Sequence, residues 1–269
     1  MPGITIDEEN QIYCLSQSWI NTFMNCPEQA RLEMVGQLPR KESDATAIGS
    51  ALHASVETVL RGGSSKESYE RGMELLHELV NLPEFEFVQI KTLSTLVNTF
   101  QRVLTQWETV IYPELPEIVL VEESFMIPIS NTPTSTIYLQ GAVDAVDEFG
   151  DIWDWKTAAR PYEQWQVDRY KIQPTVYSYA MHMQMPFVPE PTTFHYAVAM
   201  KSSDAAYIYS TTRDSQHWNW LKDQVESIVA LIQAGLDRWP MNDQHALCSP
   251  KWCTAWDSCK GSHFPVDNE

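Results

Sequence analysis

The chain has 269 residues, 43% of them hydrophobic, and a formal net charge of −18 at pH 7. That length predicts one large or two small globular domains with a substantial core. The negative charge counts against duplex binding through a broad basic surface, although local charge decides each contact. No apolar run approaches the length of a membrane span, and the N-terminus lacks the basic and apolar regions of a signal peptide. We therefore expect a soluble protein of the cytoplasm.

The first 112 residues are predicted to be entirely helical, because apolar residues recur there at helical intervals. Ser16 or Ser18 is suited to cap the first helix, and Pro27 to begin the second. The predicted helices cover residues 15–25, 27–36, 45–60, 65–82 and 87–112.

From residue 117 onward, strand patterns alternate with helical ones. Pro174 is compatible with the helix that contains it only in the first turn. The predicted strands cover residues 117–129, 136–147, 151–157, 193–201 and 206–211, and the predicted helices cover residues 170–184 and 214–238. This order predicts an α/β fold in which a sheet is flanked by helices.

Residues 140–157, QGAVDAVDEFGDIWDWKT, form the most informative stretch of the chain. Two strand-like runs flank a three-residue loop that ends at Gly150, where such a loop favours a positive φ. Counting back from the loop places Asp144 opposite Asp154. Since side chains alternate between the faces of a strand, Lys156 shares the face of Asp154.

Two carboxylates and an ammonium group on rigid strands suit a hard divalent cation, with the lysine stabilising developing negative charge. The alternative is a solvated strand face, since acidic residues are common near hairpin turns. Trp153 and Trp155 alternate with Asp154 and Lys156. This interleaving favours the metal site, because neither face is simply exposed to water.

Two further side chains are candidate metal ligands. His53 follows a run of small residues that would let its helix pack closely on a sheet, so its imidazole could reach the carboxylates. The alternative is a surface or ordinary core histidine. Glu122 and Glu123 adjoin in an apolar strand, and the one that points towards the core needs a partner or a metal. Of these two, we select Glu123.

Gln173 and Tyr177 lie four residues apart and are therefore neighbours on one helix face. They belong either to an ordinary amphipathic helix with Tyr177 half buried, or to a binding face. In the second case the amide orients phosphate or water, and the ring stacks on a base. The preceding segment 156–171 is locally positive despite the acidic chain.

Three of the five cysteines, Cys248, Cys253 and Cys259, crowd the end of the chain. Reduced cysteines clustered in this way are more often metal ligands than disulfides. Together with Cys26 they make four thiolates, which suit an iron–sulfur cluster or a structural zinc ion. Zinc held by three cysteines and a nearby histidine is the competing arrangement.

Taken together and in order, these motifs resemble the RecB-like branch of the PD-(D/E)XK nucleases. That branch includes nuclease domains of bacterial helicase–nucleases, CRISPR-associated adaptation nucleases and many phage exonucleases. The matching segments are Ser16–Ser18 with Cys26-Pro27, Gly49–His53, Gly141–Asp144, Asp154–Thr157, Gln173–Tyr177 and the three late cysteines.

The resemblance implies a restriction-endonuclease-like fold, with a central mixed sheet flanked by helices in a single domain over residues 1–269. A helical part (1–112) would precede a catalytic part (113–239) and a cysteine-rich tail (240–269). A [4Fe–4S] cluster on the four cysteines would join the N- and C-termini. The gap between Cys248 and Cys253 is longer than the family's usual spacing, so structural zinc stays open.

The resemblance also implies site roles. Mg²⁺ or Mn²⁺ would be held by His53, Asp144, Asp154 and the Trp155 carbonyl, while Lys156 would position water and stabilise the transition state. Gln173 and Tyr177 would contact the DNA strand near the scissile phosphate.

Two functions are compatible with these motifs, one enzymatic and one non-catalytic. The first is a metal-dependent exonuclease that acts on single-stranded DNA ends in recombination, repair or phage DNA processing. It could work with a helicase or recombination protein in a bacterial cell. The second is a non-catalytic DNA-end-binding or scaffolding subunit. We prefer the enzyme, because His53, Asp144, Asp154 and Lys156 are all present.

Overall fold

The computed structural model describes residues 3–36, 38, 42–242, 247–249 and 252–259. The chain forms two compact units, each assembled from separate segments. The first unit comprises Met1–Pro39, Phe125–Gly141 and Gln216–Glu269, and the second comprises Arg40–Ser124 and Ala142–Ser215. Two long strands, β5 (Ile118–Thr132) and β6 (Ser135–Asp147), run from one unit into the other.

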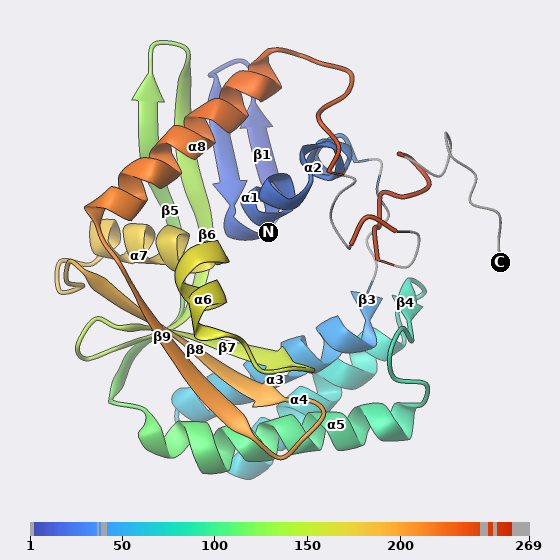
Figure 1. Cartoon of the computed structure of the whole chain (residues 1–269). Helices are drawn as coiled ribbons and strands as arrows, with labels where there is room; N and C mark the ends of the chain where they lie inside the picture. The colour runs from blue at the N-terminus through green and yellow to red at the C-terminus, as the bar shows by residue number, and fades with distance from the viewer. Residues whose placement is uncertain (1–2, 37, 39–41, 243–246, 250–251, 260–269) are drawn as a thin grey trace. The chain divides into compact units, whose positions relative to one another are not determined.

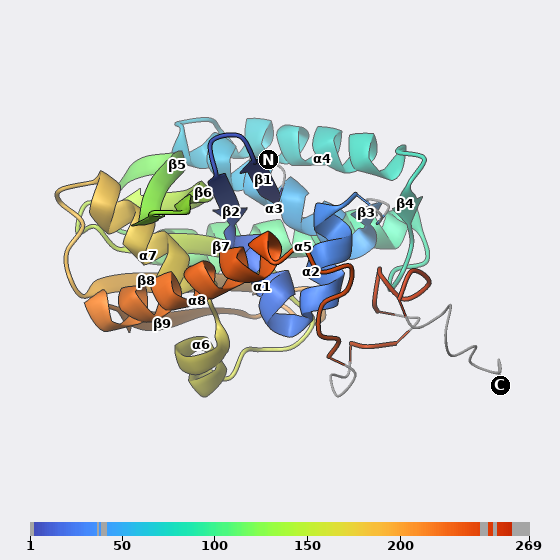
Figure 2. The ribbon, with the colours of Figure 1, turned by 90° about the horizontal axis from the view of Figure 1, so that it is seen from above.

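The paired strands of the first unit come from two of its segments, the N-terminal one and the middle one. β1 (Ile4–Asp7) pairs antiparallel with β2 (Ile12–Ser16), and β2 runs parallel to the first half of β6, with Ile12 opposite Thr136. The helices of this unit are α1 (Gln17–Asn25), α2 (Pro27–Met34) and α8 (Ser215–Gln233). Helix α8 runs diagonally past these strands (Figures 1 and 2), and its Gln233 donates to the Thr134 carbonyl at 3.0 Å.

The expectation of an entirely helical N-terminal region is wrong, because β1 and β2 precede the first helix. Other expectations for this unit are confirmed. Helix α1 begins after Ser16, whose hydroxyl accepts a hydrogen bond from the Trp19 amide, and Pro27 opens α2.

The second unit contains the mixed part of the sheet. The second half of β6 pairs antiparallel with β7 (Ile152–Ala158), β7 runs parallel to β8 (Thr192–Met200), and β8 is antiparallel to β9 (Ala206–Arg213). A short parallel pair, β3 (Glu42–Ser43) with β4 (Phe85–Glu86), lies apart from it. The helices are α3 (Asp44–Leu60), α4 (Ser65–Val80), α5 (Leu93–Gln106), α6 (Gln164–Tyr170) and α7 (Gln173–Gln184). This is the expected central mixed sheet flanked by helices (Figure 1).

The two faces of β7 have different neighbours. Trp153 and Trp155 pack with apolar residues of α3 and α5 in one buried cluster. Asp154 and Lys156 alternate with them and therefore face the other side, where the Tyr177 ring of α7 lies 6.2 Å from the ring of Phe194. The core thus fixes which side of the sheet presents the charged residues.

Helix α5 begins at Leu93 rather than near residue 87. The buried carboxylate of Asp44 accepts hydrogen bonds from the amides of Val88, Gln89 and Ile90, at distances between 2.7 and 3.2 Å. These bonds hold the preceding segment outside the helix. Pro174 is the second residue of α7, in the first turn where a proline is tolerated.

Two helical glycines give a matched test of the packing in the second unit. A Cβ on Gly72 would lie 2.2 Å from Ser55 Oγ and 2.4 Å from Phe100 Cζ, whereas a Cβ on Gly49 meets only Thr157 Oγ1, at 4.0 Å. We expect Gly72→Ala to lower the free energy of unfolding by about 1–3 kcal/mol through overpacking. Gly49→Ala should raise it by about 0.5–1 kcal/mol through helix propensity. Denaturant unfolding of both variants measures the difference, and equal effects would contradict the close packing of α4.

Candidate active site

The hairpin between β6 and β7 adopts the expected register. Ala145 pairs with Trp153, and continuing the ladder by one residue places Asp144 opposite Asp154. The loop is closed by a hydrogen bond from the Asp147 amide to the Asp151 carbonyl at 3.0 Å, and Gly150 has φ of +83°. The turn chemistry read from the sequence is therefore confirmed.

Asp144 and His53 meet at the backbone of Trp155. Asp144 Oδ2 accepts a hydrogen bond from the Trp155 amide at 2.7 Å and lies 3.5 Å from His53 Nδ1. His53 Nε2 lies 2.7 Å from the Trp155 carbonyl oxygen, and a carbonyl only accepts, so this nitrogen carries the proton. In the neutral imidazole Nδ1 then keeps a lone pair that faces a carboxylate oxygen. A proton or metal cation shared by these two acceptors would stabilise the arrangement.

Glu122 completes this group. Ligand atoms of His53, Glu122 and Asp144 all lie within 4.8 Å of one another. Burial, followed by the neighbouring Asp144 carboxylate, raises the pKa of Glu122 to about 7, against the opposing effect of His53. Two carboxylates crowded in this way are more easily ionised beside a cation.

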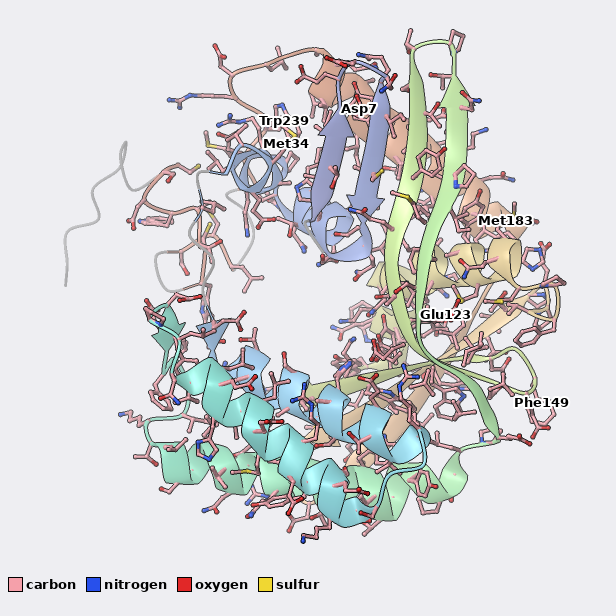
Figure 3. The ribbon with its side chains drawn as sticks, turned by 180° about the vertical axis from the view of Figure 1, so that it is seen from behind. Asp7, Met34, Glu123, Phe149, Met183 and Trp239 are labelled. Atoms are coloured by element: carbon pink, nitrogen blue, oxygen red, sulfur yellow. The ribbon has the colours of Figure 1, made fainter. Side chains whose placement is uncertain are left out.

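The sequence-based choice between the two strand glutamates needs correction, since the structure brings Glu122, not Glu123, to this group. Glu123 Oε1 instead accepts a hydrogen bond from Gln184 Nε2 at 3.0 Å, and Glu123 is seen on β5 in Figure 3. Glu122 has a positive φ of +53°, which breaks the regular alternation of side chains along β5. Nothing in the local sequence signals this break.

Asp154 and Lys156 form a buried ion pair beside the group. Lys156 Nζ lies 2.5 Å from Asp154 Oδ2, and the Asp154 side chain is 1% exposed. Burial raises the pKa of Asp154 to about 6, the Asp144 carboxylate adds to the shift, and Lys156 opposes it. Burial also disfavours the charged form of Lys156, but Asp154 and Asp144 outweigh it and hold the lysine pKa above its ordinary value. Lys156 is therefore a cation at neutral pH.

Helix α7 supplies the support for Asp154. Gln173 Nε2 donates to Asp154 Oδ1 at 2.7 Å, and the Tyr196 hydroxyl lies 3.4 Å from Gln173 Oε1. Burial raises the pKa of Tyr177, and the carboxylates of Asp154 and Asp144 raise it further, so its hydroxyl stays protonated. The predicted pair on one helix face thus lies at the carboxylates. Tyr196 was not predicted as a site residue, because it lies in an apolar strand without a recognisable motif.

These residues fit a hard divalent cation. Carboxylate and imidazole ligands gather at His53, Glu122 and Asp144, and more negative than positive charge is buried there. In addition, Asp154 Oδ2 is buried without a well-directed hydrogen bond, although the Lys156 ammonium is close to it. An acceptor left in this state is suited to bind a cation.

The four cysteines all belong to the first unit. Cys26, Cys248 and Cys253 line one pocket, together with Trp252. Burial raises the pKa of the Cys259 thiol, and the other three thiols are among the groups that add to the shift.

Helix α2 binds the segment around Trp239 close to this pocket. Glu28 is buried, accepts the amide of Trp239 at 2.7 Å, and makes two 2.8 Å contacts to Arg31. The segment that leads to the late cysteines is therefore anchored beside Cys26.

The site combines a cluster of hard ligands, a buried carboxylate and a charged lysine on a mixed sheet, which are groups that metal-dependent hydrolysis of a phosphodiester can use. The family model of the PD-(D/E)XK nuclease superfamily matches residues 14–260. The chain belongs to this superfamily of metal-dependent nucleases. Within the described residues, no helix has the length and apolar character needed to cross a membrane.

Two solved structures resemble the chain at low sequence identity, and the first of them supports the fold alone. One, from Eubacterium rectale and titled "Putative exonuclease", is 13% identical with a TM-score of 0.56, and the alignment covers 94% of this chain and 89% of that chain. Another, the protein SSO0001, is 14% identical with a TM-score of 0.47, covering 95% and 88%. No curated protein sequence matches the chain.

The two glutamates on β5 provide a matched pair of variants. We expect Glu122→Gln to weaken Mn²⁺ binding at least about tenfold, while Glu123→Gln leaves it unchanged. In the wild type, the affinity should fall as the pH is lowered through 7, because Glu122 must lose its proton to bind a cation. Isothermal titration at several pH values measures both effects. A larger loss in the Glu123 variant would contradict the placement of β5.

Proposed function

We propose that the protein is a Mg²⁺- or Mn²⁺-dependent deoxyribonuclease that degrades DNA from single-stranded ends. The observation that carries this proposal is the meeting of His53, Glu122 and Asp144 within 4.8 Å, with the buried Asp154–Lys156 pair beside them. These groups combine metal ligands with a fixed positive charge, which is what cleavage of a phosphodiester requires.

The cation would be held by His53, Glu122, Asp144 and Asp154, with the Trp155 carbonyl as a further ligand. When bound, it supplies Lewis acidity to the phosphate and lowers the pKa of a bound water. Lys156 is protonated in the resting site, so its role is to stabilise negative charge and position the nucleophilic water, rather than to accept a proton.

Gln173 is assigned a positioning role. Its amide donates to Asp154 Oδ1, which leaves Oδ2 directed towards Lys156 and a cation. Tyr177 remains a neutral phenol near the carboxylates and can donate a hydrogen bond to the strand near the scissile phosphate. Both side chains therefore act from α7 on the same carboxylate site.

Two observations support exonuclease action. The resemblance of the motifs is to enzymes that act at DNA ends, and the solved structure from Eubacterium rectale carries the name "Putative exonuclease". A bacterial or phage setting in recombination or repair, with a helicase or recombination protein as partner, follows from the same resemblance. The competing function is a DNA-end-binding subunit without catalysis.

The test is incubation of the purified full chain with end-labelled single-stranded, duplex and circular DNA in Mg²⁺ or Mn²⁺. Metal-dependent shortening of the linear single strand, absent in EDTA, is the expected result. Products labelled at either end give the polarity. Binding of DNA ends without cleavage of any substrate would favour the non-catalytic subunit.

We also propose that Cys26, Cys248, Cys253 and Cys259 bind a [4Fe–4S] cluster that ties the cysteine tail to α2. The shared pocket and the mutual influence of the thiols support this assignment.

Removing one thiolate tests the cluster. Anaerobically purified wild-type protein should be brown and contain iron, whereas Cys253→Ser should be colourless and unfold at a lower temperature. Cys14→Ser is the matched control, since Cys14 is buried in β2 and is not assigned to the cluster. Zinc without iron in the wild-type protein would replace the iron–sulfur assignment.

A further inference from the structure

Beyond the carboxylates, the catalytic face of the sheet continues as a surface of tyrosines. The strand register places Tyr196 beside Asp154, and Tyr209 beside Tyr196, in one row across β7, β8 and β9. The next row joins Lys156, Val198 and Tyr207. Directly paired residues share a face, so both β9 tyrosines lie on the side that bears Asp154 and Lys156.

The rings form a connected series. The Tyr162 ring lies 5.9 Å from that of Tyr196 and 5.7 Å from that of Tyr209, and the rings of Tyr209 and Tyr207 are 6.0 Å apart. Lys156 and Asp154 both influence the pKa of Tyr162, so the series begins next to the catalytic lysine. It ends at Tyr207, which is 41% exposed.

Positive charge accompanies these rings. Lys171 Nζ lies 4.6 Å from the centre of the Tyr162 ring. The segment 156–171 carries four basic and two acidic residues in a chain whose formal charge is −18, and its Arg160 and Arg169 are exposed. Cations beside a series of aromatic rings are complementary to a strand with a phosphate backbone and unpaired bases.

We infer that Tyr162, Tyr209 and Tyr207 form a base-stacking track that leads a single nucleic-acid strand to the catalytic site. Lys171 contacts the backbone of that strand beside Tyr162. Two strand spacings of about 4.8 Å separate β7 from β9, so the outer rings lie roughly 10 Å from the carboxylates. That distance fits the nucleotides next to the scissile bond. This inference deepens the proposed nuclease function and rests on it.

The track explains a preference for single strands. The rings can stack only on bases that have left the duplex, and stacking tolerates any base because each has a π-face. The strand would be selected by its unpaired state rather than by its sequence, as degradation from an end requires.

The test measures how much the affinity for a DNA strand depends on each tyrosine ring and on the presence of bases in the strand. A labelled oligothymidylate and an abasic strand of equal length carry the same phosphates, but only the first can stack. Fluorescence anisotropy with the full chain in EDTA compares their affinities without cleavage. We expect Tyr207→Ala and Tyr209→Ala to weaken binding of oligothymidylate about 5- to 100-fold each. Binding of the abasic strand should change less than about twofold.

Matched variants separate stacking from a change in fold. Tyr207→Phe and Tyr209→Phe keep the ring and should bind as the wild type does. Tyr112→Ala removes a ring of similar exposure, 47%, from the helical turn after α5 and should have no effect. Unchanged binding by both β9 alanine variants would overturn the track, as would an equal loss for the two strands.

The outcome is distinguishable from failure of the nuclease proposal. Suppose that the wild-type protein cleaves DNA in a metal-dependent way but binds oligothymidylate and the abasic strand equally well. This result would support the nuclease function and contradict the base-stacking track. The reverse result is base-dependent binding that the alanine variants lose, with no cleavage of any substrate. It would support the base-stacking track and contradict the proposed nuclease function.

Discussion

Replacing Lys156 with alanine is expected to lower the rate of DNA cleavage by about 10²–10³-fold, because the variant lacks the only cation held by the carboxylates in the described site. The same variant should keep or gain affinity for Mn²⁺. In the wild type, the ammonium group occupies Asp154 Oδ2, so a metal ion must compete with it. Single-turnover cleavage and titration with Mn²⁺ measure the two effects separately.

Lys66→Ala is the control for Lys156→Ala, because Lys66 makes an exposed ion pair with Glu70 at 3.6 Å on α4. It should leave cleavage and metal binding unchanged. Circular dichroism shows whether each variant is folded. Loss of metal binding together with cleavage in Lys156→Ala would mean that the lysine organises the ligands instead of acting on the substrate.

Replacing Asp154 with asparagine is expected to weaken both Mn²⁺ binding and DNA cleavage, whereas Lys156→Ala should weaken cleavage alone. The substitution keeps the size of the side chain and its contact with Gln173 but removes the buried charge that faces Lys156. Affinity for Mn²⁺ should fall with cleavage, and the rate should drop about 10³-fold, since the transition-state stabilisation by the metal is worth several kcal/mol. Raising the metal concentration should recover part of the activity.

Asp151→Asn is the control next to the same strand. Asp151 immediately precedes β7, and its carboxylate is 3.3 Å from His195 Nε2. Its removal should leave metal binding intact. If Asp154→Asn bound Mn²⁺ as tightly as the wild type, Asp154 would be a partner of Lys156 and not a ligand.

The sequence predicted those parts of the site that depend on local chemistry. A glycine at the end of a three-residue loop fixed the hairpin register, and the alternation of a strand then placed Lys156 on the face of Asp154. His53 lies on a distant helix, where the run of small residues before it indicated close packing on the sheet, and the resemblance of the motifs then assigned it to the carboxylate site.

The failures have non-local causes. Strand β2 is five residues long and runs directly into α1, and its parallel partner in β6 lies more than 100 residues away, so local helical periodicity concealed it although its antiparallel partner β1 is close in sequence. The late start of α5 depends on the carboxylate of Asp44. The choice between Glu122 and Glu123 depends on one residue with a positive φ, which strand periodicity does not reveal.

The segmental make-up of the two units has a consequence for synthesis on the ribosome. Every residue of the second unit, which holds the nuclease centre, has been added once residue 215 is in place. The first unit also needs residues 216–269, whose addition takes about 3–10 s at typical translation rates. The nuclease centre can therefore begin to fold before Cys248, Cys253 and Cys259 exist. For the proposed cluster, delivery of iron and sulfide would then be a late step in maturation, separated in time from the formation of the candidate cleavage site.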